Sequence, residues 1–181
     1  MVWGASAVYF ILGWIFFTRT FRLYALVSSL LLAIALLYFH GAYRQPAIRP
    51  TLILIGGFFT CMLIRELDFL FDELSHGSWV WFALATAAAC VVIAVLQPKR
   101  AVKGLADLLR HPAWGMLCAG LLTILVFARL FGMRDLWQHL MLDGYNHTVK
   151  NMAEEGCELL GYSLCLLASL GYLYGDRAKA E

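Results

Sequence analysis

Carboxylate, imidazole and guanidinium groups gather in a stretch that runs from Arg65 to His76, within an otherwise apolar region. At about 100° per residue, a helix over this stretch would carry most of its polar side chains on one face. That face holds Arg65, Asp68, Asp72 and His76, and Glu66 lies on a neighbouring face. The spacing predicts a helix with one polar side at the end of an apolar segment.

A second polar stretch runs from His147 to Glu158 and leads into another apolar segment. Helical spacing again gathers its polar side chains within one arc, which holds His147, Asn151, Glu154, Glu155 and Glu158. Glu158 is the most informative of them, because it lies one turn inside the apolar run. An unpaired carboxylate at such a depth costs a few kcal/mol or more.

Both stretches also have purely structural interpretations. Asn151 and Glu154 have the spacing of a helix capping box, which would account for Glu154 and for the acid beside it. Glu158 could form an ion pair with Arg65 or Arg129, which lie in apolar runs near the same side of the membrane. Such pairs, with Glu66 as a further partner, would fix helix packing without any chemistry.

If the two stretches meet, their side chains would line one polar cavity. Divalent cations that are hard or borderline prefer oxygen and nitrogen ligands of this kind. We expect a site for Zn, Mn or Fe whose ligands come from Asp68, Asp72, His76, His147, Glu154 and Glu158. A metal with three protein ligands and a water can activate that water, and Glu155 could then act as the general base.

The elements that must hold these residues follow from composition. Hydrophobic residues are 62% of the 181 residues and charged residues are 14%, whereas an ordinary soluble domain has about 25% charged residues. A soluble fold of this size leaves much of its surface in water and could not hide so much apolar surface. The composition predicts an all-α integral membrane protein that forms a single domain over residues 1–181.

Apolar runs along the chain predict about six transmembrane helices, each near the 20 residues that a crossing needs. The expected spans are 2–17, 23–39, 51–71, 79–96, 113–131 and 155–174. These runs are apolar on nearly every side, whereas the strands of a membrane barrel alternate between polar and apolar residues. A helical bundle in the lipid bilayer is therefore expected.

Loop charges predict the orientation, since cytoplasmic loops collect Lys and Arg. The loop after residue 96 carries four basic residues opposed by Asp107: Lys99, Arg100, Lys103 and Arg110. With this loop in the cytoplasm, both termini are cytoplasmic and the two polar stretches lie at the outer face of a cytoplasmic (inner) membrane. The basic residues form no stripe with interleaved aromatics, so nucleic acid is not expected as a partner.

Three classes of function fit this pattern. A metal-dependent membrane hydrolase would act on a lipid or peptide and needs the two polar stretches to converge. A non-catalytic assembly or scaffold subunit would instead show neutralised Arg–Glu pairs and no open cavity. A cation-linked transporter component would need the polar stripe to continue towards the cytoplasm, where the sequence offers only small polar groups such as Thr51 and Ser169.

Overall fold

The computed structural model describes residues 25–73, 75 and 77–175, and every regular element in this part is helical. The all-α class is therefore confirmed for the described residues. The chain passes in order through the helix Ala25–Arg44, α2 (Arg49–Glu66), α3 (Asp68–Asp72), α4 (Trp79–Leu96), α5 (Pro98–Arg110), α6 (Ala113–Leu122), the π-helical η1 (Thr123–Ala128), α7 (Arg129–Gly132), α8 (Arg134–Met141), the short 3₁₀ turn η2 (Leu142–Gly144) and α9 (His147–Tyr174).

Four of the described helices are long and apolar enough to cross a membrane: Ala25–Arg44, Trp79–Leu96, Ala113–Gly132 and His147–Tyr174. The most apolar of them, α4, has a mean hydropathy of 2.4, yet only 11% of it is buried inside the protein. Its outward side chains include Trp81 and Leu96, both exposed. A broad apolar surface of this kind marks contact with a membrane or a partner, which suggests a membrane protein.

The expectation of about six spans is not confirmed, since the described residues contain four such helices. The expected span 2–17 lies outside the described residues. The expected span 51–71 is interrupted, because α2 ends at Glu66 and Leu67 separates it from α3. Two charged residues, Arg65 and Glu66, close α2 and lower its apolar character. The expected span 79–96 has the bounds of α4, whereas α9 begins eight residues before the expected 155.

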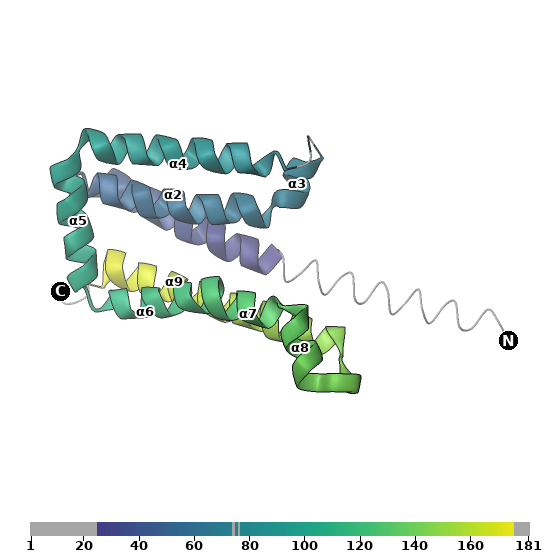
Figure 1. Ribbon diagram of the computed structural model, residues 1–181. Helices are drawn as coiled ribbons and strands as arrows, with labels where there is room; N and C mark the ends of the chain where they lie inside the picture. The colour runs from purple at the N-terminus through teal and green to yellow at the C-terminus, as the bar shows by residue number, and fades with distance from the viewer. Residues whose placement is uncertain (1–24, 74, 76, 176–181) are drawn as a thin grey trace.

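Two pairs of helices lie on either side of the helix Ala25–Arg44, as Figure 1 shows: α2 with α4, and α6–α7 with α9. The central helix buries one stripe of side chains at helical spacing, namely Val27, Leu31, Ile34, Ala35, Tyr38 and Ala42. Tyr38 contacts both pairs. Its ring stacks on Phe59 of α2 with 6.1 Å between centroids, and its hydroxyl oxygen lies within hydrogen-bond distance of Ser169 Oγ of α9, at 3.2 Å.

Glycines bring α9 close to the helix that begins with α6. A Cβ added at Gly161 would lie 2.5 Å from a side-chain carbon of Ile124 and 2.9 Å from the carbonyl oxygen of Gly120. A Cβ at Gly120 would meet the carbonyl oxygen of Gly161 at 2.8 Å. Small residues commonly allow such backbone contact between helices in membranes. The two glycines therefore set the distance between α9, which carries the second polar stretch, and the helix that leads from α6 to Arg129.

A Gly161→Ala substitution should destabilise the protein by about 1–3 kcal/mol, the usual cost of overpacking a filled interface. Gly156→Ala in the same helix is the matched control, because a Cβ there meets nothing within 4 Å. Thermal unfolding in detergent, followed by loss of helical circular dichroism, would compare the two variants. Equal melting temperatures for Gly161→Ala and Gly156→Ala would contradict this helix contact.

A helix, α5, occupies most of the segment after residue 96 that the loop charges predict to be a cytoplasmic loop. Figure 1 shows α5 crossing one end of the bundle at a steep angle to the long helices. Pro98 stands in its first turn, where a missing N–H costs nothing. Thr51 of α2 donates a hydrogen bond of 3.0 Å to the carbonyl oxygen of Ala101, and Gly104 is buried against the same threonine. These contacts fix α5 to the bundle.

Candidate functional site

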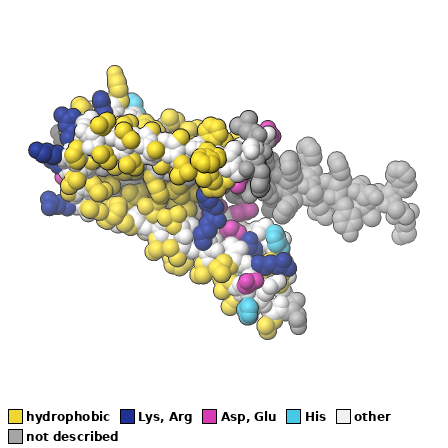
Figure 2. Space-filling view, turned by 45° about the horizontal axis from the view of Figure 1, so that its top comes forward, with side chains coloured by type: hydrophobic (Ala, Val, Ile, Leu, Met, Phe, Trp, Pro, Cys, Tyr) yellow, Lys and Arg dark blue, Asp and Glu magenta, His cyan; other side chains and the backbone are white. Residues whose placement is uncertain are grey.

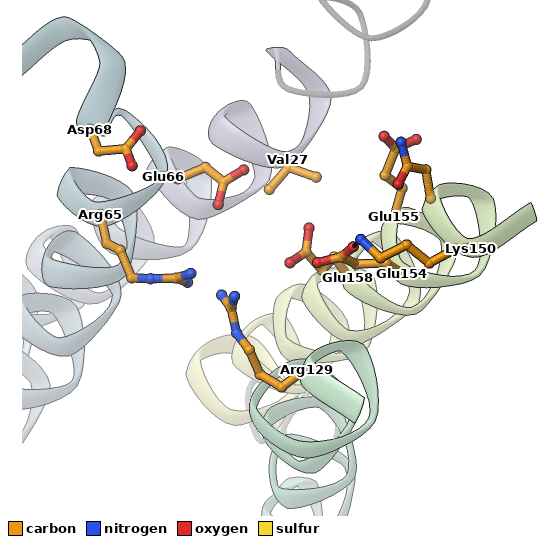
Figure 3. A pocket seen from close by; sticks show the side chains of 10 residues that line it. Val27, Arg65, Glu66, Asp68, Arg129, Lys150, Glu154, Glu155 and Glu158 are labelled. Carbon is orange, nitrogen blue, oxygen red and sulfur yellow. Dashed lines mark hydrogen bonds and ion pairs between the residues drawn. The ribbon is translucent and has the colours of Figure 1, made fainter. Parts of the chain in front are cut away.

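A polar cavity of about 340 Å³ lies at the end of the bundle opposite α5. Helices from both pairs contribute to it, together with the start of the helix Ala25–Arg44. Its lining consists of Val27, Arg65, Glu66, Asp68, Arg129, Lys150, Asn151, Glu154, Glu155 and Glu158. The two polar stretches of the sequence therefore meet in one place, as Figure 3 shows.

Two arginines from opposite sides converge in this cavity. Arg65 lies in the last turn of α2, and Arg129 is the first residue of α7. Figure 3 shows their side chains pointing towards one another. Among the described residues, neither guanidinium forms an ion pair with a carboxylate. Two like charges that face each other repel, so an anion between them would lower the free energy of the site.

The direction of Arg129 depends on the π-helical segment η1, which ends just before it. A π-helical turn holds more residues than an α-helical turn, so it rotates the side chains that follow. Single π turns within α-helices often occur at functional sites. Arg129 is placed at the cavity by a local departure from the regular helix, which the apolar sequence Thr123–Ala128 does not reveal.

Five carboxylates line the other sides of the cavity. Glu66 and Asp68 come from the region where α2 gives way to α3, and α9 supplies Glu154, Glu155 and Glu158. Figure 3 shows Glu66 on the side of α2 and Glu158 on the side of α9. With three basic residues against five acidic ones, the lining has a formal net charge of −2. The cavity therefore combines a cationic centre with an excess of acid.

One of the acids is already neutralised. Lys150 Nζ lies 2.9 Å from Glu154 Oε2 in an ion pair that spans one turn of α9, and both side chains are largely buried. Gly132 leaves room for this carboxylate, because a Cβ there would lie 2.6 Å from Glu154 Oε1. The remaining cavity acids make no ion pair within residues 25–73, 75 and 77–175.

Of the residues expected from the sequence to form the site, the structure brings seven to the cavity: Arg65, Glu66, Asp68, Arg129, Glu154, Glu155 and Glu158. His147 does not line it. This residue is exposed at the start of α9, and its Nδ1 lies 3.3 Å from Asn151 Nδ2. His76 and the side chain of Asp72 lie outside the part that the structure describes.

The metal site remains a prediction. In the described part of the chain, no three His, Cys, Asp or Glu side chains are grouped so that they could hold a metal ion. This finding does not cover His76 and the Asp72 side chain, two of the expected ligands, because they lie outside the described part. A divalent cation would draw on the acids of the cavity, among which Glu66 and Glu158 are close enough to interact electrostatically.

The two structural interpretations of these acids are not supported in the described residues. The helix does not begin near Asn151, because α9 starts at His147 and is capped by Asn146, whose side chain accepts a hydrogen bond of 2.9 Å from the Thr148 amide. The capping box is therefore wrong. Glu158 likewise forms no ion pair with Arg65 or Arg129 in the described part.

Sequence reasoning missed Lys150 as a cavity residue, whereas Asn151 was expected on the polar face of the second stretch. Lys150 could have been found, because it precedes Glu154 by four residues, and oppositely charged side chains at this spacing meet on a helix. Val27 carried no such signal, since it belongs to an apolar run like many others in the chain. Only the packing of the central helix brings it to the cavity.

The chain matches no protein-family model, no curated protein and no solved structure. Its function is therefore argued from the cavity and the helices that build it.

Proposed function

We propose that this is a multi-pass inner-membrane protein whose outer cavity binds a molecule carrying a phosphate beside an amine, the chemistry of a phosphoethanolamine headgroup. The observation that carries the proposal is the convergence of Arg65 and Arg129, whose guanidiniums face one another without a carboxylate partner in the described part of the chain. A phosphate placed between them would relieve their repulsion.

Arginine suits the phosphate half of the ligand. A guanidinium is planar and permanently charged, and its donors match two phosphate oxygens at once. Arg65 and Arg129 come from different helix pairs, so one phosphate would accept hydrogen bonds from both and tie the pairs together. The volume of about 340 Å³ lies within the usual range for small-ligand sites.

The carboxylates suit the amine half. A simple anion would enter a lining whose formal net charge is already −2, and the surrounding acids would repel it. A zwitterion adds no net charge, because its ammonium group can approach Glu66 and Glu158 while its phosphate contacts the arginines. Ionised donors and acceptors of this kind form the stronger hydrogen bonds found in proteins. The mixed lining therefore favours a ligand with both charges.

The proposed orientation places the cavity where headgroups are found. The basic residues of α5 and Arg44 lie at the opposite end of the bundle, and the excess of Lys and Arg on cytoplasmic loops puts that end inside. The cavity then opens at the outer surface, next to the headgroup layer. The termini would be cytoplasmic in this arrangement.

Thermal unfolding of the detergent-solubilised protein tests the proposal. Glycerophosphoethanolamine, which has both groups and no acyl chains, should raise the melting temperature, since a ligand at 100 times its Kd stabilises by about 2.7 kcal/mol. Glycerol phosphate and ethanolamine, offered alone at the same concentration, should each give a much smaller shift. Equal shifts from all three compounds, or none from any, would overturn the proposal.

A metal-dependent hydrolase is the second candidate, favoured by the position of Glu155. This carboxylate lines the cavity and has no ion-pair partner among the described residues, as a base acting on a water requires. The substrate would be a lipid or peptide at the outer leaflet. Elemental mass spectrometry of the wild type and of Glu158→Gln tests this candidate. Stoichiometric Zn, Mn or Fe that is lost in the variant would support it, and a metal-free wild type would contradict it.

The scaffold and transporter alternatives have less support. A scaffold site predicts neutralised Arg–Glu pairs, whereas the arginines of the cavity are unpaired in the described part. A transporter needs a polar path through the bundle. The buried hydroxyls of Thr51 and Ser169 are instead bonded to the protein, to the carbonyl oxygens of Ala101 and Cys165 respectively. Tyr162 is buried one turn below Glu158.

A further inference from the structure

The helix α5 presents three faces with different chemistry. The first contacts the protein: Gly104 and Leu108 are buried, and the carbonyl oxygen of Ala101 accepts the hydrogen bond from Thr51. With 13 residues, α5 is too short to cross a bilayer, which needs about 20. It lies across the end of the bundle (Figure 1) and is held there by these contacts. Its remaining faces therefore have fixed directions.

The second face of α5 is apolar and exposed. Val102, Leu105 and Leu109 are 68%, 48% and 49% exposed, and their spacing of three and four residues places them on one side of the helix. Leu108 makes the buried contact with the bundle, whereas each of these three side chains leaves about half or more of its surface uncovered within the described protein. An exposed apolar stripe on an amphipathic helix is the part that enters the interface of a membrane.

The third face is basic. Lys99, Lys103 and Arg110 fall within about 40° of one another at helical spacing, and all three are exposed. Arg100 lies nearby and donates to the side chain of Gln97 at 3.1 Å, while Asp107 is the one acid of the helix. Figure 2 shows Lys and Arg side chains gathered at this end of the molecule.

We propose that α5 lies in the plane of the membrane surface and binds anionic phospholipid headgroups with its basic face. Val102, Leu105 and Leu109 enter the boundary between headgroups and acyl chains, and Lys99, Lys103 and Arg110 contact the phosphates. The proposal rests on the membrane placement given above and is independent of the ligand in the cavity. Anionic lipids attract basic residues that lie near the surface.

The end of the neighbouring helix supports this placement. Tyr43 and Arg44 close the helix Ala25–Arg44 on the same side as α5, and both are exposed, Tyr43 to 81%. Tyrosine is enriched where a membrane meets water, because its ring is apolar and its hydroxyl is polar. An interfacial tyrosine, an adjacent arginine and a basic amphipathic helix at one level define a surface for headgroups.

Native mass spectrometry of the full-length protein in detergent tests the proposal. Phosphatidylglycerol and phosphatidylcholine with identical acyl chains are titrated, and the ratio of their apparent Kd values is measured. We expect the wild type to bind phosphatidylglycerol more tightly than phosphatidylcholine. In the variant Lys99→Gln/Lys103→Gln/Arg110→Gln, this ratio of affinities should be smaller by about tenfold or more. A variant that keeps the wild-type preference would overturn the proposal.

Two further variants keep the test decisive if the triple substitution impairs folding. Asp107→Asn removes the one acid of α5 and should strengthen the preference for phosphatidylglycerol a few-fold, while an unchanged or weaker preference would contradict the proposal. Arg134→Gln is the matched control, because this exposed arginine lies on α8 at the opposite end, and its preference should equal that of the wild type. The cavity is tested separately with glycerophosphoethanolamine, which has no acyl chains, so failure of the cavity ligand and failure of this surface are distinguishable.

Discussion

Replacing Arg129 with Gln is expected to weaken the binding of glycerophosphoethanolamine about 10- to 100-fold. The side chain points into the cavity towards Arg65, and hydrogen bonds to charged groups contribute about 1.5–3 kcal/mol each. Gln keeps a polar side chain but loses the charge and the paired donors. Because Arg129 contacts the phosphate half, binding of glycerol phosphate should fall together with binding of the whole headgroup. Equilibrium binding of radiolabelled ligand to detergent-solubilised protein measures both.

Arg134→Gln is the control for this prediction. Arg134 is five residues further along the chain, is exposed, and lies over the ring of Tyr145 at 5.9 Å and not in the cavity. Its variant should bind the headgroup like the wild type. An Arg129→Gln protein with wild-type affinity and wild-type melting temperature would show that the converging arginines do not hold the phosphate.

Replacing Glu158 with Gln is expected to remove selectivity for the amine. The headgroup should bind roughly tenfold or more weakly, since one charge-assisted hydrogen bond is lost. Glycerol phosphate alone should bind as well as before or better, because the lining loses one of its five acids. The ratio of the two affinities is the measured quantity, and it separates the role of Glu158 from that of Arg129.

Glu73→Gln supplies the matched control, since Glu73 is exposed and does not line the cavity. It removes the same charge and should leave the ratio unchanged. The amine contact would be excluded by a Glu158→Gln variant that retains full selectivity for glycerophosphoethanolamine over glycerol phosphate.

Helix positions could be predicted from the sequence where an apolar run had clear ends. The expected span 79–96 coincides with α4, because Gly77 and Ser78 precede it and Gln97 and Pro98 follow it. The expected span 155–174 leaves out the first two turns of α9, since they are polar and do not resemble a span, although the spacing of the polar stretch already favoured a helix there. The helix α5 was not predicted, because its many charged residues are typical of a loop. The helical spacing of Val102, Leu105 and Leu109 was overlooked.

The meeting of the two polar stretches in one cavity could be anticipated, because the expected spans that carry them place both stretches at the same end of the bundle. Which of its charged side chains form ion pairs could not be anticipated. Whether Glu158 pairs with an arginine depends on the distance between helix pairs, which contacts such as Gly120 with Gly161 determine. Single-residue spacing carries no information about that distance. The π-helical turn before Arg129 is equally invisible in an apolar sequence.

Isothermal titration calorimetry of the detergent-solubilised wild type with glycerophosphoethanolamine tests the central claim most directly, beside the variant Arg65→Gln/Arg129→Gln. We predict saturable binding of one ligand per chain to the wild type and no measurable binding to the variant, with both proteins retaining their helical content. Absence of binding to the wild type, or equal binding to both proteins, would contradict the assignment of the cavity as a site for a phosphate with an adjacent amine.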